Sequence, residues 1–141
     1  GGAIVTIGSV NTFRGAGGWP YPAACGALLG MTRCLAMELA PYKIRVNLVG
    51  MGTTHTESLE ELSGGREAQD MSAASIPLAR VGWPRDTAPI VVWLCSDESE
   101  YVTGETITAD GGWIYTHWLG GVDLNLRAYR AKPKALWTEK P

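Results

Sequence analysis

Two short runs of β-branched and apolar residues, separated by one long helical repeat, constrain most strongly what this chain can fold into. Residues 3–7 and 44–49 each have the length and composition of a buried strand. Between them, residues 22–40 carry apolar side chains at three- and four-residue spacing, which predicts an amphipathic helix ended by Pro41. A strand, a helix and a strand in this order predict a parallel βαβ unit with a right-handed connection. The expected buried stripe of the helix is Leu28, Met31, Leu35 and Leu39.

The remaining sequence adds loops, a second helix and a third strand. Residues 11–20 are rich in Gly and Pro and predict a loop, while residues 56–74 predict a mobile loop with short helical pieces, of a kind that often covers a site. A second helix is expected over residues 84–96, kinked at Pro89 or starting late because of it. Residues 106–109 predict a third strand. The pattern is that of a parallel α/β sheet.

Composition narrows the classes of protein to consider. A chain of 141 residues suits one small domain, and Lys+Arg 12 against Asp+Glu 14 gives 12 − 14 = −2, which argues against a nucleic-acid binder. Cys25, Cys34 and Cys95 are few and widely spaced, so we expect small buried thiols in a reducing, cytoplasmic compartment. No run reaches the roughly 20 apolar residues of a membrane span, and we expect no membrane partner.

The last part of the chain differs in charge from the rest. From His117 onward there are five basic and two acidic residues, 5 − 2 = +3, which leaves −2 − 3 = −5 for the preceding part. We therefore divide the chain into residues 1–115 and a tail, residues 116–141. The tail is either an arm that lies on another subunit or a frayed terminus.

Hydroxyl side chains fall where parallel strands end. Ser9 ends the first strand, Tyr21 precedes the helix, and residues 52–56 follow the second strand. Ligands of open α/β sheets bind beyond the carboxyl ends of the strands, so these residues should face one crevice. There a serine could bond a carbonyl oxygen while a tyrosine gives or takes the proton, provided that a nearby lysine lowers the phenol pKa from about 10.

Four sequence blocks, in order, resemble the short-chain dehydrogenase/reductase family. They are residues 6–10 (TIGSV), 21–30 (YPAACGALLG), 39–47 (LAPYKIRVN) and 103–112 (TGETITADGG). The resemblance covers residues 1 to about 115 and matches the later part of that fold. It implies the last three strands of a doubly wound, Rossmann-like parallel sheet with their helices. The Gly-rich pyrophosphate turn and the adenosine pocket of the family are expected to be absent from this chain.

The resemblance also implies roles for single residues. Ser9 would polarise the carbonyl group of an alcohol or carbonyl substrate, and Tyr21 would act as the general acid and base. The implied cofactor is NAD or NADP, held in part by Tyr21, Met51, Gly52, Thr54 and Thr56. Cys25 stands at the position of the family's catalytic lysine, four residues after the tyrosine. A neutral thiol cannot favour the phenolate as an ammonium does.

Two functions follow from this reading. The first is an NAD(P)-dependent alcohol/carbonyl oxidoreductase with an altered site, inactive when the chain is alone. The second is a non-catalytic subunit or oligomerisation module, with a homo- or hetero-oligomeric partner.

Cys25 could be a reactive thiol at a helix N-terminus or an inert buried one. Trp19 could line the mouth of the substrate site, and His55 and His117 predict no metal site.

Overall fold

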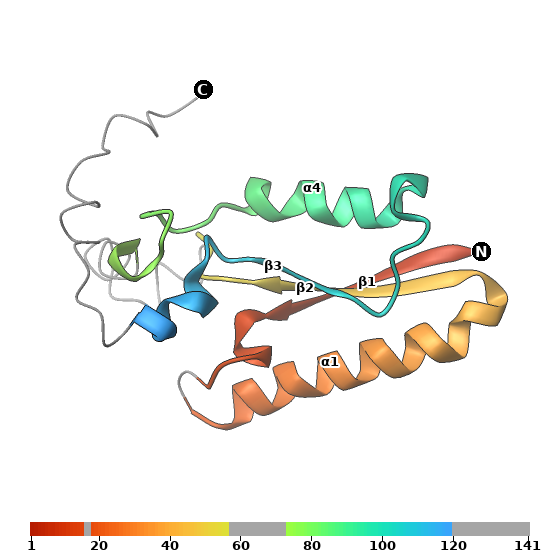
Figure 1. The fold of residues 1–141 in the computed structure, drawn as a ribbon, viewed down its shortest axis with the longest axis horizontal. Coiled ribbons are helices and arrows are strands. Elements are labelled where there is room, and N and C mark those ends of the chain that lie inside the picture. The colour runs from red at the N-terminus through yellow and green to blue at the C-terminus, as the bar shows by residue number, and fades with distance from the viewer. Residues whose placement is uncertain (16–17, 57–72, 120–141) are drawn as a thin grey trace.

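A three-stranded parallel sheet lies between two long helices in the computed structural model of the protein (Figure 1). The structure describes residues 1–15, 18–56 and 73–119. Strands β1 (Gly2–Ser9), β2 (Ile44–Met51) and β3 (Thr106–Ala109) lie in the order β1-β2-β3. Helix α1 (Pro20–Leu39) covers one face of the sheet and α4 (Pro84–Cys95) the other. This arrangement confirms the α/β parallel architecture and the βαβ order that the sequence predicts.

The register of the sheet brings the carboxyl ends of β1 and β2 together. Gly2 pairs with Ile44 and the pairing continues without a break to Ser9 and Met51. β2 is the central strand, and its five residues 46–50 are buried, as expected for a strand covered on both faces. Four short 3-10 helices complete the described fold: η1 (Val10–Thr12), η2 (Ala40–Tyr42), η3 (Asp97–Ser99) and η4 (Trp113–Leu119). η1 lies in a segment for which a loop is predicted.

Two polar side chains of β2, the buried Asn47 and the half-buried Arg45, hold the segment that leads into β3. The Asn47 amide donates to the Val102 carbonyl (2.9 Å), and its oxygen accepts from the Glu105 N–H (3.1 Å). The Arg45 guanidinium donates to the Ser99 hydroxyl (3.0 Å) and the Ser96 carbonyl (3.0 Å). The Asn47 bonds satisfy backbone groups that no strand or helix pairs, and together with the Arg45 bonds they fix where β3 runs.

β1 is less buried than the sequence predicts. Ile4 and Ile7 are 40% and 50% exposed, although a fully buried strand was expected over residues 3–7. β1 is an edge strand of the described sheet, so nothing in the described part of the chain covers its outer side. A continuous apolar run therefore predicts a strand whose side chains are suited to burial, but it does not identify the part of the protein or the partner that covers them.

The buried stripe of α1 also differs from the expected one. Cys25, Thr32 and Ala36 are buried, whereas Met31 is 43% exposed and the expected leucines are half-buried. Small residues lie on the sheet because the helix packs closely against it. The Thr32 hydroxyl, for example, is 3.0 Å from that of Thr6.

The same helix contradicts the expectation that no apolar run is long enough for a membrane span. The segment Pro20–Tyr42 has 23 residues and a mean hydropathy of 1.3, which meets that criterion by length and composition. In the structure this segment comprises α1, which lies on the sheet, and η2.

Other expectations are corrected or fall outside the described residues. α4 begins at Pro84 with Pro89 inside it, so a late start is wrong. Cys25 is buried as expected, but Cys34 and Cys95 are exposed. η4 crosses the expected boundary at residue 115. Residues 57–72, most of the expected mobile loop, and residues 120–141 of the tail lie outside the described residues.

Candidate functional site

A hollow of about 650 Å³ lies beyond the carboxyl ends of β1 and β2, beside the first turns of α1. Its volume is typical of small-molecule sites. The structure brings every residue proposed above for catalysis or cofactor binding to this one hollow. They are Ser9, Tyr21, Cys25, Met51, Gly52, Thr54 and Thr56.

Ser9 supplies a buried hydroxyl at the end of β1. Its oxygen accepts a hydrogen bond from the Asn11 N–H (3.2 Å), which caps η1 and fixes the side chain. The proton of the Ser9 hydroxyl donates to no described atom. The group can therefore donate to an oxygen atom of a ligand in the hollow.

Tyr21 lies in the first turn of α1 and is 59% exposed. Pro20 and Pro22 flank it, and both fit here because the first N–H groups of a helix have no partner within the helix. No described atom bonds the phenol oxygen. The sequence predicts Tyr21 just before the helix, and the structure places it in the helix, where its direction is fixed relative to Cys25 one turn later.

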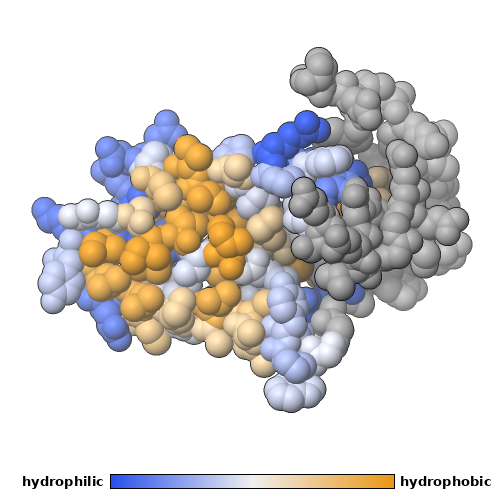
Figure 2. Space-filling view, turned by 180° about the vertical axis from the view of Figure 1, so that it is seen from behind, coloured by the Kyte–Doolittle hydropathy of each residue, from blue (hydrophilic) through white to orange (hydrophobic). Residues whose placement is uncertain are grey.

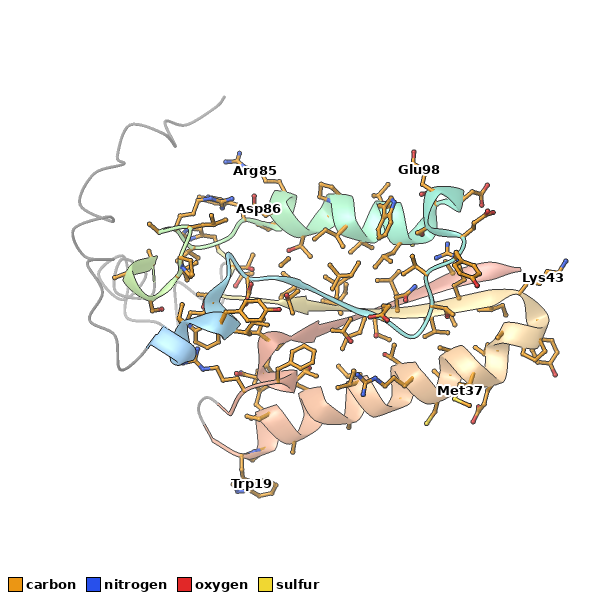
Figure 3. The ribbon with its side chains drawn as sticks, in the orientation of Figure 1. Trp19, Met37, Lys43, Arg85, Asp86 and Glu98 are labelled. Carbon is orange, nitrogen blue, oxygen red and sulfur yellow. The ribbon has the colours of Figure 1, made fainter. Side chains whose placement is uncertain are left out.

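Cys25 is buried, with 4% of its surface exposed, and lines the hollow on the same helix face as Tyr21. Its carbonyl accepts a hydrogen bond from the Thr12 hydroxyl (3.1 Å), which ties η1 to α1. Its burial indicates that the Cys25 thiol is inert rather than reactive. Lys43, the one lysine among the described residues, lies at the far end of α1 from Trp19 (Figure 3).

The loop after β2 lies against the turn that follows β3. The Gly52 N–H donates to the Ala109 carbonyl (3.0 Å), and a Cβ at Gly52 would lie 2.7 Å from the Cα of Asp110. Only glycine fits this approach without a shift. The Thr54 hydroxyl donates to the Gly52 carbonyl (3.0 Å), and Thr54 forms a parallel bridge with Gly82. The loop is thus held in place from both sides.

Trp113, rather than Trp19, is the tryptophan at the hollow. Trp19 is 81% exposed and points away from the sheet (Figure 3), so the expectation that it lines the mouth is wrong. Trp113 follows β3, and its indole N–H donates to the Ser75 hydroxyl (3.1 Å). Sequence reasoning also missed Asn11, which lines the hollow. Only its place two residues after the end of β1 could have indicated it.

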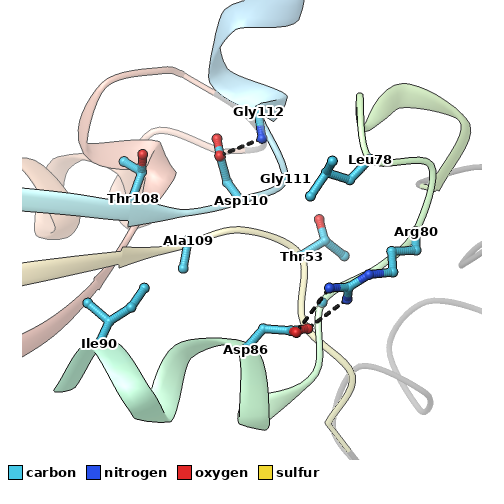
Figure 4. A pocket seen from close by; sticks show the side chains of 11 residues that line it. Thr53, Leu78, Arg80, Asp86, Ile90, Thr108, Ala109, Asp110, Gly111 and Gly112 are labelled. Carbon is cyan, nitrogen blue, oxygen red and sulfur yellow. Dashed lines mark hydrogen bonds and ion pairs between the residues drawn. The ribbon is translucent and has the colours of Figure 1, made fainter. Parts of the chain in front are cut away.

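A second hollow, of about 530 Å³, lies on the other side of Thr53, toward α4 (Figure 4). The Arg80 guanidinium bonds both oxygens of Asp86 (2.6 and 3.0 Å), and this bond is the main reason why the pKa of Asp86 lies below its ordinary value and that of Arg80 above. The carboxylate of Asp110 accepts from two backbone N–H groups, those of Gly112 and Ile114 (2.8 Å each). The charged groups here bond one another or the backbone, which indicates a structural role.

Comparison with known proteins identifies the family. The family model described as Enoyl-(Acyl carrier protein) reductase matches residues 1–114. The human dehydrogenase/reductase SDR family member 4 is 39% identical over 113 residues, covering 79% of this chain and 41% of that protein. A 3-oxoacyl-acyl-carrier-protein reductase of Thermotoga maritima is 40% identical over 114 residues, covering 80% and 46%.

Solved structures agree with these relatives. A Beutenbergia cavernae protein, provisionally assigned as an NAD(P)-dependent gluconate 5-dehydrogenase and solved with NADP at low occupancy, has a TM-score of 0.75 and 35% identity. The match covers 80% of this chain and 46% of that one. The chain thus spans less than half the length of the curated relatives named above. Its match to the family model over residues 1–114 nevertheless shows that the chain belongs to the short-chain dehydrogenase/reductase family.

Proposed function

We propose that this chain forms the catalytic wall of an NAD(P)-dependent oxidoreductase that acts on an alcohol or carbonyl substrate. The observation that carries the proposal is that the hydroxyls of Ser9 and Tyr21 border one hollow at the strand ends. The Ser9 hydroxyl would donate to the substrate oxygen. In alcohol oxidation the substrate hydroxyl loses its proton toward the Tyr21 oxygen, and in carbonyl reduction the phenol returns a proton to the same atom.

The residues fit the nicotinamide end of such a cofactor. When bound, the cofactor accepts or supplies the hydride of the reaction. The loop of Met51, Gly52, Thr54 and Thr56 offers backbone groups and hydroxyls to a carboxamide, and Tyr21 borders the same space. The NADP-containing structure of the Beutenbergia relative supports the cofactor class. A preference for NAD or NADP depends on the adenosine side, and we propose none.

Cys25 sets the level of activity that we expect. Unlike a lysine, a neutral thiol at this position gives no electrostatic support to the phenolate. General acid–base catalysis contributes roughly 10²–10⁴-fold to a rate, so a weakened base costs much of the turnover. We therefore expect this chain by itself to be a poor catalyst.

A second candidate function is that of a non-catalytic subunit or oligomerisation module. The exposed Ile4 and Ile7 of β1 favour it, since an uncovered edge of a parallel sheet invites pairing with another chain. Figure 2 shows that apolar side chains also gather on the face opposite that of Figure 1. A homo- or hetero-oligomer would cover such surfaces.

The three free thiols support a reducing, cytoplasmic setting.

Turnover assays separate the two functions. The purified chain is incubated with NAD⁺ or NADP⁺ and a panel of alcohols, and reduced nicotinamide is followed by its absorbance. The oxidoreductase proposal predicts slow turnover that falls at least about tenfold further in Ser9→Ala and Tyr21→Phe. Turnover unchanged by both substitutions, or no turnover from a stable oligomer, would instead support the non-catalytic subunit.

A further inference from the structure

Arg14 places a positive charge beside the hollow, on the ring of Trp113, which lines it. Its guanidinium carbon lies 3.7 Å from the centre of the Trp113 ring, and one of its nitrogens is 3.5 Å from the Trp113 carbonyl. Arg14 follows η1, whereas Trp113 follows β3, so the contact joins two segments that are far apart in the sequence. The Trp113 indole is fixed by its hydrogen bond to the Ser75 hydroxyl, and the Trp113 backbone N–H donates to the Asp110 carbonyl (3.2 Å). The guanidinium is therefore held in a defined place.

No carboxylate in the described part of the chain pairs with Arg14. Within residues 1–15, 18–56 and 73–119 the structure shows one ion pair, that between Arg80 and Asp86, and Arg14 has none. The described residues that line the hollow are all neutral. An arginine stacked on an aromatic ring still presents its planar N–H donors at the edge, in a geometry that suits a carboxylate. A single uncompensated cation beside a neutral hollow favours an anionic ligand.

Asn11 adds an unmet hydrogen-bond acceptor to the same hollow. Its side-chain oxygen Oδ1 is buried and has no hydrogen-bond partner among the described residues, while its backbone N–H donates to the Ser9 hydroxyl. A buried acceptor without a donor is unfavourable, because the group has lost its hydrogen bonds to water. Because Asn11 lines the hollow, the donor that it lacks can come from a ligand hydroxyl.

These observations limit the substrate class. We propose that the hollow takes a compact polyhydroxy carboxylic acid, or the keto acid formed from it. The carboxylate would lie toward Arg14, one hydroxyl would donate to Asn11 Oδ1, and the reacting hydroxyl or carbonyl would face Ser9 and Tyr21. This inference rests on the proposed function for the reacting group, but its binding part does not require catalysis.

A pair of matched probes tests the charge requirement. D-Gluconate carries a carboxylate, whereas D-glucitol is the neutral polyol of the same carbon number, and binding of each to the full chain is measured by calorimetry and ligand-observed NMR. We expect D-gluconate to bind at least about tenfold more tightly than D-glucitol. Arg14→Gln should abolish this preference. Arg33→Gln, which removes an exposed positive charge of α1 that does not line the hollow, should keep it.

Asn11→Ala tests the hydroxyl contact. It should weaken both probes by a similar factor, because both carry hydroxyl groups, and leave the ratio between them unchanged. Equal binding of the two probes, binding of neither, or a preference that survives Arg14→Gln would overturn the inference.

The outcome is separable from that of the proposed function. Arg14-dependent binding of D-gluconate without hydride transfer to NAD⁺ or NADP⁺ would refute the oxidoreductase proposal and leave the acid site standing. Turnover of neutral alcohols by a chain that binds D-gluconate no more tightly than D-glucitol would refute the acid site alone.

Discussion

At the scale of single residues, the acid–base role proposed for Tyr21 depends on the side chain at position 25. A lysine there would lie one helical turn after Tyr21 and would favour the phenolate. We predict that Cys25→Lys raises turnover near neutral pH by at least about tenfold and moves the rising limb of the pH–rate profile to lower pH. Cys34→Lys, on the exposed side of the same helix, is the control. Equal rates for the two variants would contradict the role given to Tyr21.

Gly52 tests how closely the two loops must approach. In Gly52→Ala the added Cβ meets the backbone and side chain of Asp110 at 2.7 Å, so the loops must separate. We expect a loss of about 1–3 kcal/mol in the free energy of unfolding, measured by urea denaturation, together with weaker ligand binding. Gly30→Ala is the matched control. Nothing lies within 4 Å of its Cβ, and helix propensity predicts a gain of up to about 1 kcal/mol.

At the scale of elements, the start of α4 is held by one carboxylate. Asp86 accepts from the Trp83 N–H (2.7 Å) and from Arg80, and these bonds lower its pKa in the folded state. A lowered folded-state pKa gives stability that is present above the unfolded value of about 3.9 and is lost as the pH falls through the folded one.

Asp86→Asn should therefore lower the free energy of unfolding above about pH 5, and the difference from the natural chain should shrink below about pH 4. The pair is partly exposed, so the effect is at most about 1 kcal/mol. Thermal unfolding across this pH range measures it. Glu98→Gln removes an exposed carboxylate whose side chain points away from α4 (Figure 3) and should show no such dependence. A constant difference down to pH 2 would be the contradicting result.

The elements themselves could be predicted from the sequence because their periodicity is local. The runs of β-branched residues and the helical spacing of α1 fix β1, α1 and β2 without reference to the rest of the chain. The site could be predicted in part for a similar reason. Ser9, Tyr21 and the loop after β2 lie at strand ends, and a parallel register brings such ends together.

What could not be predicted depends on contacts between distant segments. The sequence does not show that β1 is an edge, that α1 packs through Thr32 and Ala36, or that Trp113 reaches the hollow from beyond β3. The stacking of Arg14 on Trp113 joins residues 99 positions apart, which no local pattern records.

At the scale of the whole molecule, the open edge of β1 should control association. We predict that the chain forms dimers or larger species in solution and that Ile4→Lys shifts it toward the monomer, because an inserted charge opposes edge pairing. Analytical ultracentrifugation gives the mass of each species. Val92→Lys adds the same charge to α4, where Val92 is 68% exposed, and should leave the mass unchanged. A similar effect of both variants would assign association to another surface.

The central claim is that the hollow at the ends of β1 and β2 receives the reacting part of a nicotinamide cofactor. The most direct test is NMR mapping of the full chain with nicotinamide mononucleotide at millimolar concentration, because this probe carries the nicotinamide end without the adenosine end. The account predicts that the largest shifts of backbone amides fall on Asn11, Gly52, Thr54 and Thr56, which border the hollow. Shifts confined to other parts of the chain, or none, would contradict it.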